Sequence, residues 1–278
     1  MNERGPLLTL QVHEQLVAAK RAGGGEVRCS LDLNRSSSIV QVNPEGWTWQ
    51  GKTFPLMTAC KDRTIYYWNV SQFDPVSRYD GALIKLVPTQ WGAPTFEIDG
   101  IKMLPTEKVS PFEDARKKVG LIEPNGKRIL DTCGGLGYFA THCLEGGAQQ
   151  VISYEKHPSV VWLRSLNPWS PEQLCAGDQR LQFTQSSVLD HIDGFDPQTF
   201  DALLHDPPRF GIAGELYAQT FYDALARVLK RRGKLFHYTG SPNRLTSGRD
   251  VPNEVATRLK RAGFSAQLIG DGVLAIKR

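Results

Sequence analysis

The sequence predicts an α/β protein in which a small β-rich amino-terminal domain precedes a larger domain built around a parallel sheet. From about residue 110 onward, strand-like and helix-like segments alternate, whereas the earlier part has short aromatic and β-branched runs between turn signals. The chain ends in FSAQLIGDGVLAIKR, two apolar runs joined by Gly270-Asp271-Gly272, which predicts a hairpin and a terminal antiparallel strand. We place the domains at residues 1–105 and 106–278.

The amino-terminal domain is predicted from IVQVNPEGWTWQGKTF, TIYYWNV and GALIKLVPTQWGAPTFEIDGIKM. Their β-branched and aromatic residues favour strands, and their Asn-Pro, Gly-Lys and Gly-Ala pairs favour turns. A helix over about 7–21 is expected before them. Two interpretations of the aromatic side chains remain open, because they can form a core or stack on the bases of a nucleic acid. These residues are Trp47, Trp49, Tyr66, Tyr67 and Trp68.

The second domain contains short apolar segments, each bounded by turn signals, that predict strands. The strands are predicted over 128–132, 150–154, 180–184, 200–205 and 233–238. Helices are predicted from Ser110-Pro111 onward and over 136–145, 158–166, 214–231 and 252–262. Cations at 230–232 would suit the negative end of the helix over 214–231. This alternation predicts a parallel sheet with helices on both faces.

Composition excludes several classes of function. The 278 residues are 40% hydrophobic and 22% charged, with a net charge of +4, which permits a nucleic-acid partner without requiring one. The five cysteines include no CxxC pair and the six histidines no HExxH pair, so we expect neither a disulfide framework nor a metal site. No apolar run reaches the length of about 20 residues that a membrane span needs, and no signal peptide is evident. We therefore expect a cytoplasmic protein.

A glycine-rich turn follows the first predicted strand, in ILDTCGGLGYFA. Gly134, Gly135 and Gly137 let the backbone turn tightly and approach a ligand closely. Glu155 follows the second strand, where a carboxylate can accept hydrogen bonds from both hydroxyls of a ribose, although a solvated strand end is the alternative. The spacing from Gly135 to Ala140 also satisfies the dinucleotide fingerprint, so a nicotinamide cofactor remains open.

The segment LLHDPPRF ends the fourth predicted strand in a carboxylate and two prolines. In a doubly wound sheet this strand lies beside the strand of the glycine-rich turn, at the point where ligands bind. Because prolines hold the backbone extended and donate no amide proton, the carbonyls of Asp206 and Pro207 remain free acceptors beside the Asp206 carboxylate. Three rigid acceptors suit a target that brings donors, such as an amino group. Simple strand termination is the alternative.

These motifs support a resemblance. The chain from about 110 onward resembles the class I S-adenosylmethionine-dependent methyltransferases, whose first motif is an acidic residue followed by a Gly-x-Gly-x-Gly loop. More narrowly, LDTCGGLGYFA, LNPWS, LLHDPPRFGIAGELY and VLKRRGKLFHYTGSP, with the upstream KLVPT and APTFEIDGIKM, resemble a largely uncharacterised, mainly archaeal family of predicted methyltransferases with a D-P-P-R-F motif. The resemblance implies a Rossmann-like sheet and S-adenosylmethionine as cofactor.

The family pattern implies which residues hold the cofactor. Asp131, Gly135 and Gly137 would cradle the methionine part, and Glu155 would bind the ribose. The sequence departs from the pattern at Cys133, which replaces the first glycine, and at Ser186, where an acidic residue usually contacts the adenine, with Asp190 further on as the alternative. The full set of expected cofactor contacts is Asp131, Cys133, Gly134, Gly135, Gly137, Tyr138, Glu155 and Ser186.

The Asp-Pro-Pro element matches methyltransferases that modify exocyclic amines of adenine or cytosine. We therefore expect N-methylation of a base in RNA, with the amino-terminal domain gripping the polynucleotide. The expected catalytic residues are Asp206, Pro207, Pro208 and Phe210. Phe210 would stack on an extruded base, since Arg209 occupies the position of the usual aromatic. The expected substrate contacts are Arg209, Tyr217, Arg244 and Arg249, the last two with ordinary loop charge as the alternative.

Other functions remain open from the same residues. A small-molecule transferase of the same fold, such as an aminopropyl transferase like spermidine synthase, is the main alternative, although the sequence shows no additional acidic cluster for a polycation. A nicotinamide-dependent oxidoreductase and a non-catalytic cofactor-binding module are the others. Cys133 is interpreted as a small packing residue, and His205 and His237 as buried against the sheet rather than catalytic.

Overall fold

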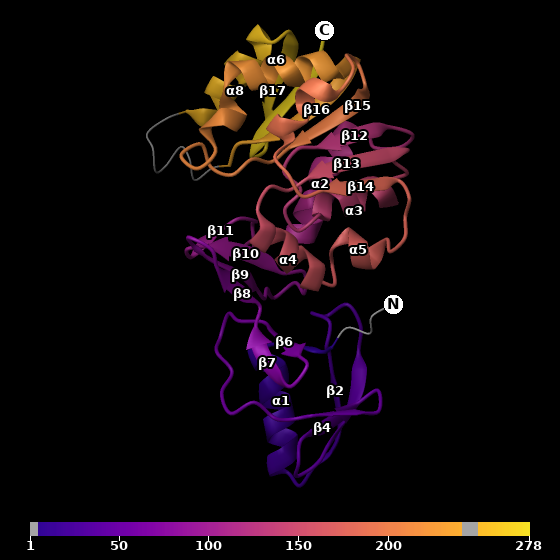
Figure 1. Cartoon of the computed structure of the whole chain (residues 1–278), viewed down its shortest axis with the longest axis vertical. Helices are drawn as coiled ribbons and strands as arrows, with labels where there is room; N and C mark the ends of the chain where they lie inside the picture. The colour runs from indigo at the N-terminus through magenta and orange to yellow at the C-terminus, as the bar shows by residue number, and fades with distance from the viewer. Residues whose placement is uncertain (1–4, 241–249) are drawn as a thin grey trace. The chain divides into compact units, whose positions relative to one another are not determined.

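The computed structural model describes residues 5–240 and 250–278, and it divides into two compact units. The first comprises Met1–Phe112 with Ser165–Trp169, and the second comprises Glu113–Arg164 with Ser170–Arg278. Figure 1 labels the helices and strands of both units. Among the helices in the described part of the chain, none combines the length and the apolar character that crossing a bilayer requires.

The second unit is built on a seven-stranded sheet with the strand order β14-β13-β12-β15-β16-β18-β17. Its strands are β12 (Arg128–Asp131), β13 (Gln150–Tyr154), β14 (Leu181–Thr184), β15 (Phe200–His205), β16 (Leu229–Tyr238), β17 (Phe264–Ile269) and β18 (Gly272–Lys277). Strands β12 to β16 are parallel, whereas β18 is antiparallel to both β16 and β17. The predicted parallel sheet with a terminal antiparallel hairpin strand is confirmed.

Helices connect these strands, and most begin where the sequence predicts. They are α2 (Pro111–Ile122), α3 (Tyr138–Glu145), α4 (Pro158–Leu166), α5 (Pro171–Leu174), α6 (Gln219–Val228) and α8 (Val251–Arg261), with the short 3₁₀ turns η1 (Val188–Asp190), η2 (Ile192–Gly194) and η3 (Gly214–Tyr217). Asp250 caps α8, because its carboxylate accepts a hydrogen bond from the backbone amide of Asn253.

The predicted helix over 214–231 is wrong at its end. Helix α6 stops at Val228, and Leu229 already pairs with Phe200 as the first residue of β16. A register shift follows, and Arg232 has a positive φ of 62°, so the exposed cations at 230–232 lie on a strand rather than in the last helical turn. Burial of the Leu229 side chain, which is 0% exposed, favours this non-local pairing over continued helix.

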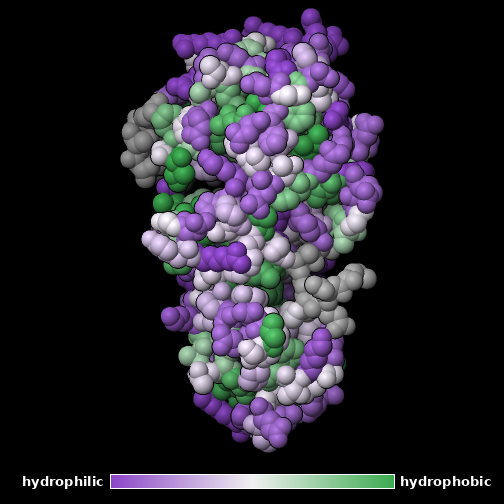
Figure 2. All heavy atoms as spheres, viewed as in Figure 1, coloured by the Kyte–Doolittle hydropathy of each residue, from purple (hydrophilic) through white to green (hydrophobic). Residues whose placement is uncertain are grey.

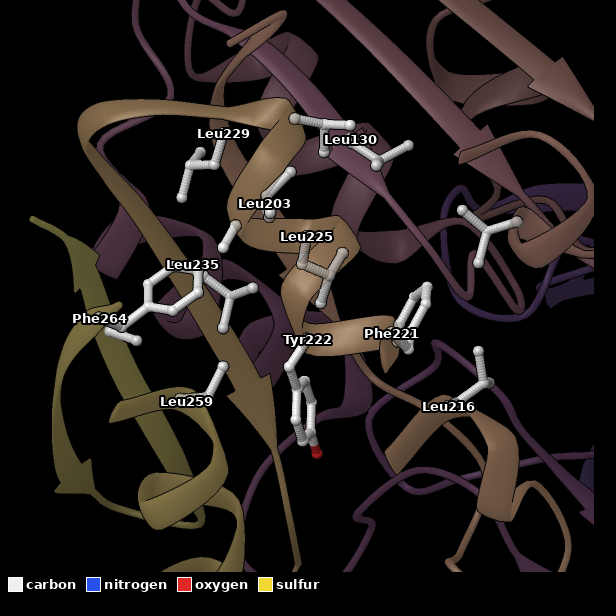
Figure 3. Packing of buried hydrophobic residues seen from close by; sticks show 14 of the residues in the cluster. Leu130, Leu203, Leu216, Phe221, Tyr222, Leu225, Leu229, Leu235, Leu259 and Phe264 are labelled. Carbon is white, nitrogen blue, oxygen red and sulfur yellow. The ribbon is translucent and has the colours of Figure 1, made fainter. Parts of the chain in front are cut away.

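The sheet of the second unit is buried on both faces. On one face, Leu130, Leu203 and Leu235 pack against Phe221 and Leu225 of α6, as Figure 3 shows. Helix α8 adds Val255 and Leu259 to the same cluster. The alternate strand residues Ile129, Ala202 and Leu204 point to the other face and are also fully buried. Burial on both faces explains why these strands read as continuous apolar runs.

The first unit consists of antiparallel sheets and one helix, α1 (Leu10–Arg21). Its strands are β1 (Leu7–Leu8), β2 (Gly25–Cys29), β3 (Ser38–Val42), β4 (Trp47–Trp49), β5 (Lys52–Phe54), β6 (Tyr66–Asn69), β7 (Gln72–Pro75), β8 (Ser77–Tyr79), β9 (Leu83–Val87), β10 (Thr95–Ile98) and β11 (Ile101–Lys102). The predicted helix over 7–21 starts too early, because Leu7 and Leu8 are buried and pair with β6.

The aromatic side chains of the first unit largely form a core. Trp47 is fully buried and stacks on Phe54, with ring centroids 4.6 Å apart, and Tyr66 is also buried. Trp49 and Trp68 are partly buried and pack against the same cluster. Of the two interpretations of these aromatics, the structure supports the core for these four, whereas the fifth, Tyr67, is half-buried and is not part of this cluster.

Candidate active site

The sheet of the second unit has a carboxyl edge, where β12 to β16 end, and this edge collects the residues of both sequence motifs. Strands β12 and β15 are neighbours, with Asp131 opposite Leu204. Just beyond them, the Thr132 amide donates to the Leu204 carbonyl at 3.0 Å, and the Thr132 hydroxyl lies 2.6 Å from Nδ1 of His205. The glycine-rich turn after β12 and the Asp206-Pro207-Pro208 segment after β15 therefore begin side by side.

The glycine-rich turn has a conformation that only glycines adopt without strain. Gly135 and Gly137 have φ values of 48° and 82°, and α3 begins directly after Gly137. A Cβ on Gly134 would lie 2.4 Å from the Ser153 hydroxyl, and one on Gly137 would lie 2.5 Å from the Pro171 ring. The Gly134 amide also donates to the Tyr154 carbonyl at 2.6 Å, which fixes the turn against the end of β13.

Two carboxylates flank this turn. Asp131 is 0% exposed and accepts a hydrogen bond from the Ser153 hydroxyl on Oδ2 at 2.8 Å, while no described residue donates to its Oδ1. Burial raises the pKa of Asp131 to about 6. Glu155 accepts from the amides of Gly135 and His157, each at 2.9 Å, and burial raises its pKa although both amides lower it. Glu155 thus joins the end of β13 to the turn.

Cys133 and Ser186 complete the expected cofactor contacts at this edge. Burial, and secondarily the Glu155 carboxylate, hold the pKa of the Cys133 thiol well above its usual range, so it is a neutral packing residue, as expected. Ser186 is half-buried after β14, and its hydroxyl lies 3.4 Å from the carboxylate of the exposed Asp190. Tyr138, the first residue of α3, is buried.

Asp206 is half-buried directly after β15, and no described residue makes a hydrogen bond to its carboxylate. Burial raises its pKa to about 7, although the nearby Lys118 ammonium lowers it. Among the described residues, no backbone amide donates to the carbonyl of Asp206 or of Pro207, whereas the Pro208 carbonyl accepts from the Tyr217 hydroxyl at 3.1 Å. Two backbone acceptors therefore remain beside one carboxylate, as expected from the prolines.

Tyr217 supports the proline segment. It is 3% exposed, and its hydroxyl is used by Pro208, so the expected contact of Tyr217 with substrate is not supported by its position. Its ring meets the half-buried Phe210 edge to face, with centroids 5.5 Å apart. The half-buried Arg209 makes a turn, since its carbonyl accepts from the amides of Ile212 and Ala213. The two other expected substrate contacts, Arg244 and Arg249, lie outside the described residues.

His205 and His237 are fully buried at the ends of β15 and β16, as expected. Nε2 of His205 lies 3.1 Å from the Leu216 carbonyl, and Nδ1 of His237 lies 2.8 Å from the Tyr238 carbonyl. A carbonyl only accepts, so each of these nitrogens carries a proton. Burial lowers the pKa of His205 well below its usual range and that of His237 to about 4. Both rings fix strand ends rather than transfer protons at neutral pH.

The structure also places a charged cluster at this edge that the sequence analysis missed. Lys118 of α2 is buried, with Nζ 2.6 Å from Oδ2 of Asp114 and 3.2 Å from Oδ2 of Asp271 in the β17–β18 turn. Nζ also lies 4.0 Å from the centre of the Tyr238 ring. We call Lys118, Asp114, Asp271 and Tyr238 the Lys118 cluster. The expectation of no additional acidic cluster was wrong, because Asp114 and Asp271 are far apart in sequence and meet only in the folded sheet.

Comparisons with known proteins identify the family and the fold. No family model matches the chain. The uncharacterized protein MJ1233 of Methanocaldococcus jannaschii is 41% identical over 268 residues, which cover 91% of this chain and 90% of that protein. The chain belongs to the same family. The matched residues extend into both units.

Among solved structures, the chain is similar to spermidine synthase in complex with the transition state analogue AdoDATO, with a TM-score of 0.58 and 19% identity over 73% of each chain. Spermidine synthase from Thermotoga maritima gives a TM-score of 0.56 at 19% identity, covering 73% of this chain and 72% of that one. An S-adenosylmethionine dependent methyltransferase from Mesorhizobium loti gives 0.42 at 13% identity, covering 59% and 98%. This chain has a Rossmann-like fold, with additional antiparallel sheets.

Proposed function

We propose that this chain is an S-adenosylmethionine-dependent methyltransferase that methylates an exocyclic amine of cytosine or adenine in RNA. The observation that carries the proposal is the pairing of β12 with β15, which sets the glycine-rich turn beside Asp206, Pro207 and Pro208 at the carboxyl edge. A donor held by the turn and an acceptor nitrogen held by the proline segment would then meet at one edge.

The residues of the turn fit S-adenosylmethionine. Oδ1 of Asp131 is a buried acceptor without a described partner, and the positive φ values of Gly135 and Gly137 let the backbone turn tightly beside it. Asp131, Gly135 and Gly137 would hold the methionine part, Glu155 the ribose and Ser186 the adenine. When bound, the sulfonium supplies a methyl group that is already highly electrophilic.

The chain's own residues then orient the nucleophile and exclude water. The Asp206 carboxylate and the Pro207 carbonyl accept the two hydrogens of the amine, which localises its lone pair toward the methyl group. As the nitrogen–carbon bond forms and the carbon–sulfur bond breaks, the amine loses one proton. Asp206 accepts that proton, for which a pKa of about 7 is well matched. Phe210 offers the ring that stacks on the base.

A second candidate is aminopropyl transfer to an amine. The Lys118 cluster favours it, because Asp114 and Asp271 meet at the Lys118 ammonium and their charges also raise the pKa of Asp206, and a polycation would require such a group of carboxylates. The two spermidine synthases that share the fold point the same way. Methyl transfer to a neutral amine remains the better proposal, since the two backbone carbonyls suit an NH₂ group and Lys118 already neutralises the carboxylates.

Calorimetric titration with S-adenosylmethionine, decarboxylated S-adenosylmethionine and NAD tests the donor. We expect S-adenosylmethionine to bind more tightly than the other two, and Glu155→Gln to weaken that binding. Tight binding of NAD alone contradicts the proposal, and preference for the decarboxylated form favours the second candidate.

Nucleoside mass spectrometry of total RNA from a deletion strain tests the substrate. We expect one N-methylated cytidine or adenosine to disappear and to return when the wild-type gene is restored. The matched control is restoration with Asp206→Asn, which should leave the nucleoside absent. Unchanged methylated nucleosides in the deletion strain contradict RNA as the substrate.

A further inference from the structure

Lys118 is an unusual group for the edge of a parallel sheet. Its side chain is 6% exposed, and its ammonium is 2.6 Å from Asp114 and 3.2 Å from Asp271. The ammonium also faces the ring of Tyr238 at 4.0 Å. Carboxylates on two sides and an aromatic face on a third form the environment in which proteins bind alkylammonium groups.

Asp206 adjoins this environment. His205 pairs with His237 in the register of β15 and β16, so the next residues along these strands are neighbours: Asp206 directly follows β15, and Tyr238 is the last residue of β16. Burial alone would lower the pKa of Lys118, but Asp206, Asp114 and Asp271 together raise it, with Asp206 the strongest of the three. Four separate elements thus supply three carboxyl groups and a ring around one ammonium.

We propose that Lys118 is a specificity-determining residue. Its ammonium occupies the place beside Asp206 that the alkylammonium group of a diamine or polyamine would take, and it reserves the site for a neutral amine. This inference rests on the proposed function, since it concerns the acceptor at the same site. A second ammonium entering the cluster would meet like charge, whereas an uncharged NH₂ group would meet only acceptors.

Calorimetric titration of putrescine into the full chain at pH 8 tests this inference. The variant Lys118→Met removes the charge and keeps the length, and Lys118→Arg is the matched control that keeps the charge. We expect Lys118→Met to bind putrescine at least about tenfold more tightly than the wild type, a gain of about 1.4 kcal/mol, and Lys118→Arg to behave as the wild type. Equal affinity of wild type and Lys118→Met overturns the inference.

A second variant covers the case in which Lys118→Met is too unstable to study. Lys118→Met with Asp114→Asn removes one charge of each sign and leaves Asp206 and Asp271 in place. Putrescine should raise the melting temperature of this double variant and leave that of the wild type unchanged; no rise overturns the inference. Titration with S-adenosylmethionine in the same samples tests the proposed function separately. If S-adenosylmethionine does not bind, the proposed function is contradicted, and the putrescine result can still be interpreted.

A separate observation concerns the opposite, amino edge of the sheet. Three segments there, LKRRG (229–233), KRAGFS (260–265) and IKR (276–278), contain no acidic residue. They lie together, since Phe264 pairs with Lys277, the Lys277 ammonium donates to the Leu229 carbonyl at 2.6 Å, and the Arg278 amide donates to the Gly263 carbonyl at 3.1 Å. Their exposed cations, which we call the amino-edge cations, are Lys230, Arg231, Arg232, Lys260, Arg261 and Arg278.

The geometry points to this edge as a surface that binds the phosphate backbone of single-stranded RNA. Of the six amino-edge cations, the described residues supply an ion-pair partner to Lys230 alone, which lies 2.7 Å from Asp201. Figure 2 shows strongly hydrophilic residues along the side of the second unit at which the C terminus lies. Uncompensated cations on one face are the electrostatic footprint of a polyanion partner. This inference rests on the proposed RNA substrate and assigns contact to the second unit.

Fluorescence anisotropy with a labelled single-stranded RNA of about 20 nucleotides tests this surface. The triple variant Arg231→Gln, Arg232→Gln and Arg278→Gln should bind at least about tenfold more weakly, and its salt dependence should fall by about 2 in slope. The control variant Arg21→Gln, Lys52→Gln and Lys61→Gln removes as many cations from the first unit and should bind as the wild type does. The reverse pattern, or no RNA binding by the wild type, overturns the inference, and titration with S-adenosylmethionine shows separately whether the methyltransferase proposal stands.

Discussion

The two edges of the seven-stranded sheet carry charge in opposite ways. The carboxyl edge holds buried or half-buried carboxylates at Asp131, Glu155 and Asp206. The buried Arg164 guanidinium lowers the pKa of the first two, and the buried Lys118 ammonium lowers that of Asp206. The amino edge holds exposed cations, and its ion pairs, such as Lys234 with Glu123 at 2.7 Å, lie at the surface. The same strands end at both edges, so the difference comes from the loops and turns that follow them rather than from the sheet.

This contrast shows that the fold keeps carboxyl groups in an unfavourable environment at the carboxyl edge and not at the amino edge. At the carboxyl edge, burial raises the pKa of Asp131 to about 6 and that of Asp206 to about 7, which is characteristic of reactive groups. At the amino edge, solvent screens the charges, and surface ion pairs contribute little to stability. The effects of substitutions at the two edges should therefore differ in size and in sign, and four predictions test the comparison.

The largest effect is expected for Asp206→Asn. An amide cannot accept the proton of the amine, so transfer of a tritiated methyl group to RNA from the deletion strain should fall about 10³-fold. Binding of S-adenosylmethionine should change by less than about twofold, since the Asp206 carboxylate is not among the expected cofactor contacts. The exposed Asp193→Asn is the control and should keep full activity. More than a tenth of wild-type activity in Asp206→Asn would contradict the assigned role.

The second effect concerns the glycine-rich turn. Gly137→Ala combines a φ of 82° with a Cβ 2.5 Å from Pro171, so the free energy of unfolding should fall by about 2–4 kcal/mol. Urea denaturation measures this loss. Gly211→Ala, whose Cβ would meet nothing within 4 Å, is the matched control and should change stability by less than about 0.5 kcal/mol. Equal values for the two variants would show that the turn tolerates a side chain.

A third prediction concerns the dependence of stability on pH. The pKa of Asp206 is raised from 3.8 to about 7, so the folded chain binds a proton there more strongly than the unfolded chain does. The stability from this group is present below about pH 4 and is lost as pH rises through 7. Asp206→Asn should therefore stabilise the chain by about 1–2 kcal/mol at pH 8 and by almost nothing at pH 4. Urea denaturation at both pH values checks this. A gain in the free energy of unfolding seen only at pH 4 would contradict the predicted direction.

The smallest effect is expected at the amino edge. Glu123 is exposed and pairs with Lys234, and the Lys234 ammonium lowers the pKa of the Glu123 carboxyl. Because solvent screens this pair, Glu123→Gln should leave the free energy of unfolding from urea denaturation unchanged within error at pH 7. The control is Glu215→Gln, which removes another exposed carboxylate of the second unit. A clear loss in Glu123→Gln alone would show that the amino edge also depends on its charges.

Sequence reasoning located most of the second unit because its signals are local. Apolar runs such as 150–154 and 200–205 coincide with β13 and β15, and the Gly270-Asp271-Gly272 turn lies in the predicted hairpin. The start of β16 was missed because the cations at 230–232 suit a helix end, whereas the pairing of Leu229 with Phe200 is non-local. The site motifs were found for the same reason, since glycine permits a positive φ and proline fixes φ at its own position in the chain.

The sequence by itself determined the alternation of strands and helices, the glycine-rich turn after β12, and the rigid proline segment after β15, because each depends on residues adjacent in the chain. The tertiary structure alone decided that Asp114, Lys118 and Asp271 form one cluster beside Asp206, that Tyr217 holds the Pro208 carbonyl, and that cations from three segments share the amino edge. Such contacts depend on which strands become neighbours, and that order is set by burial of the whole sheet rather than by any local pattern.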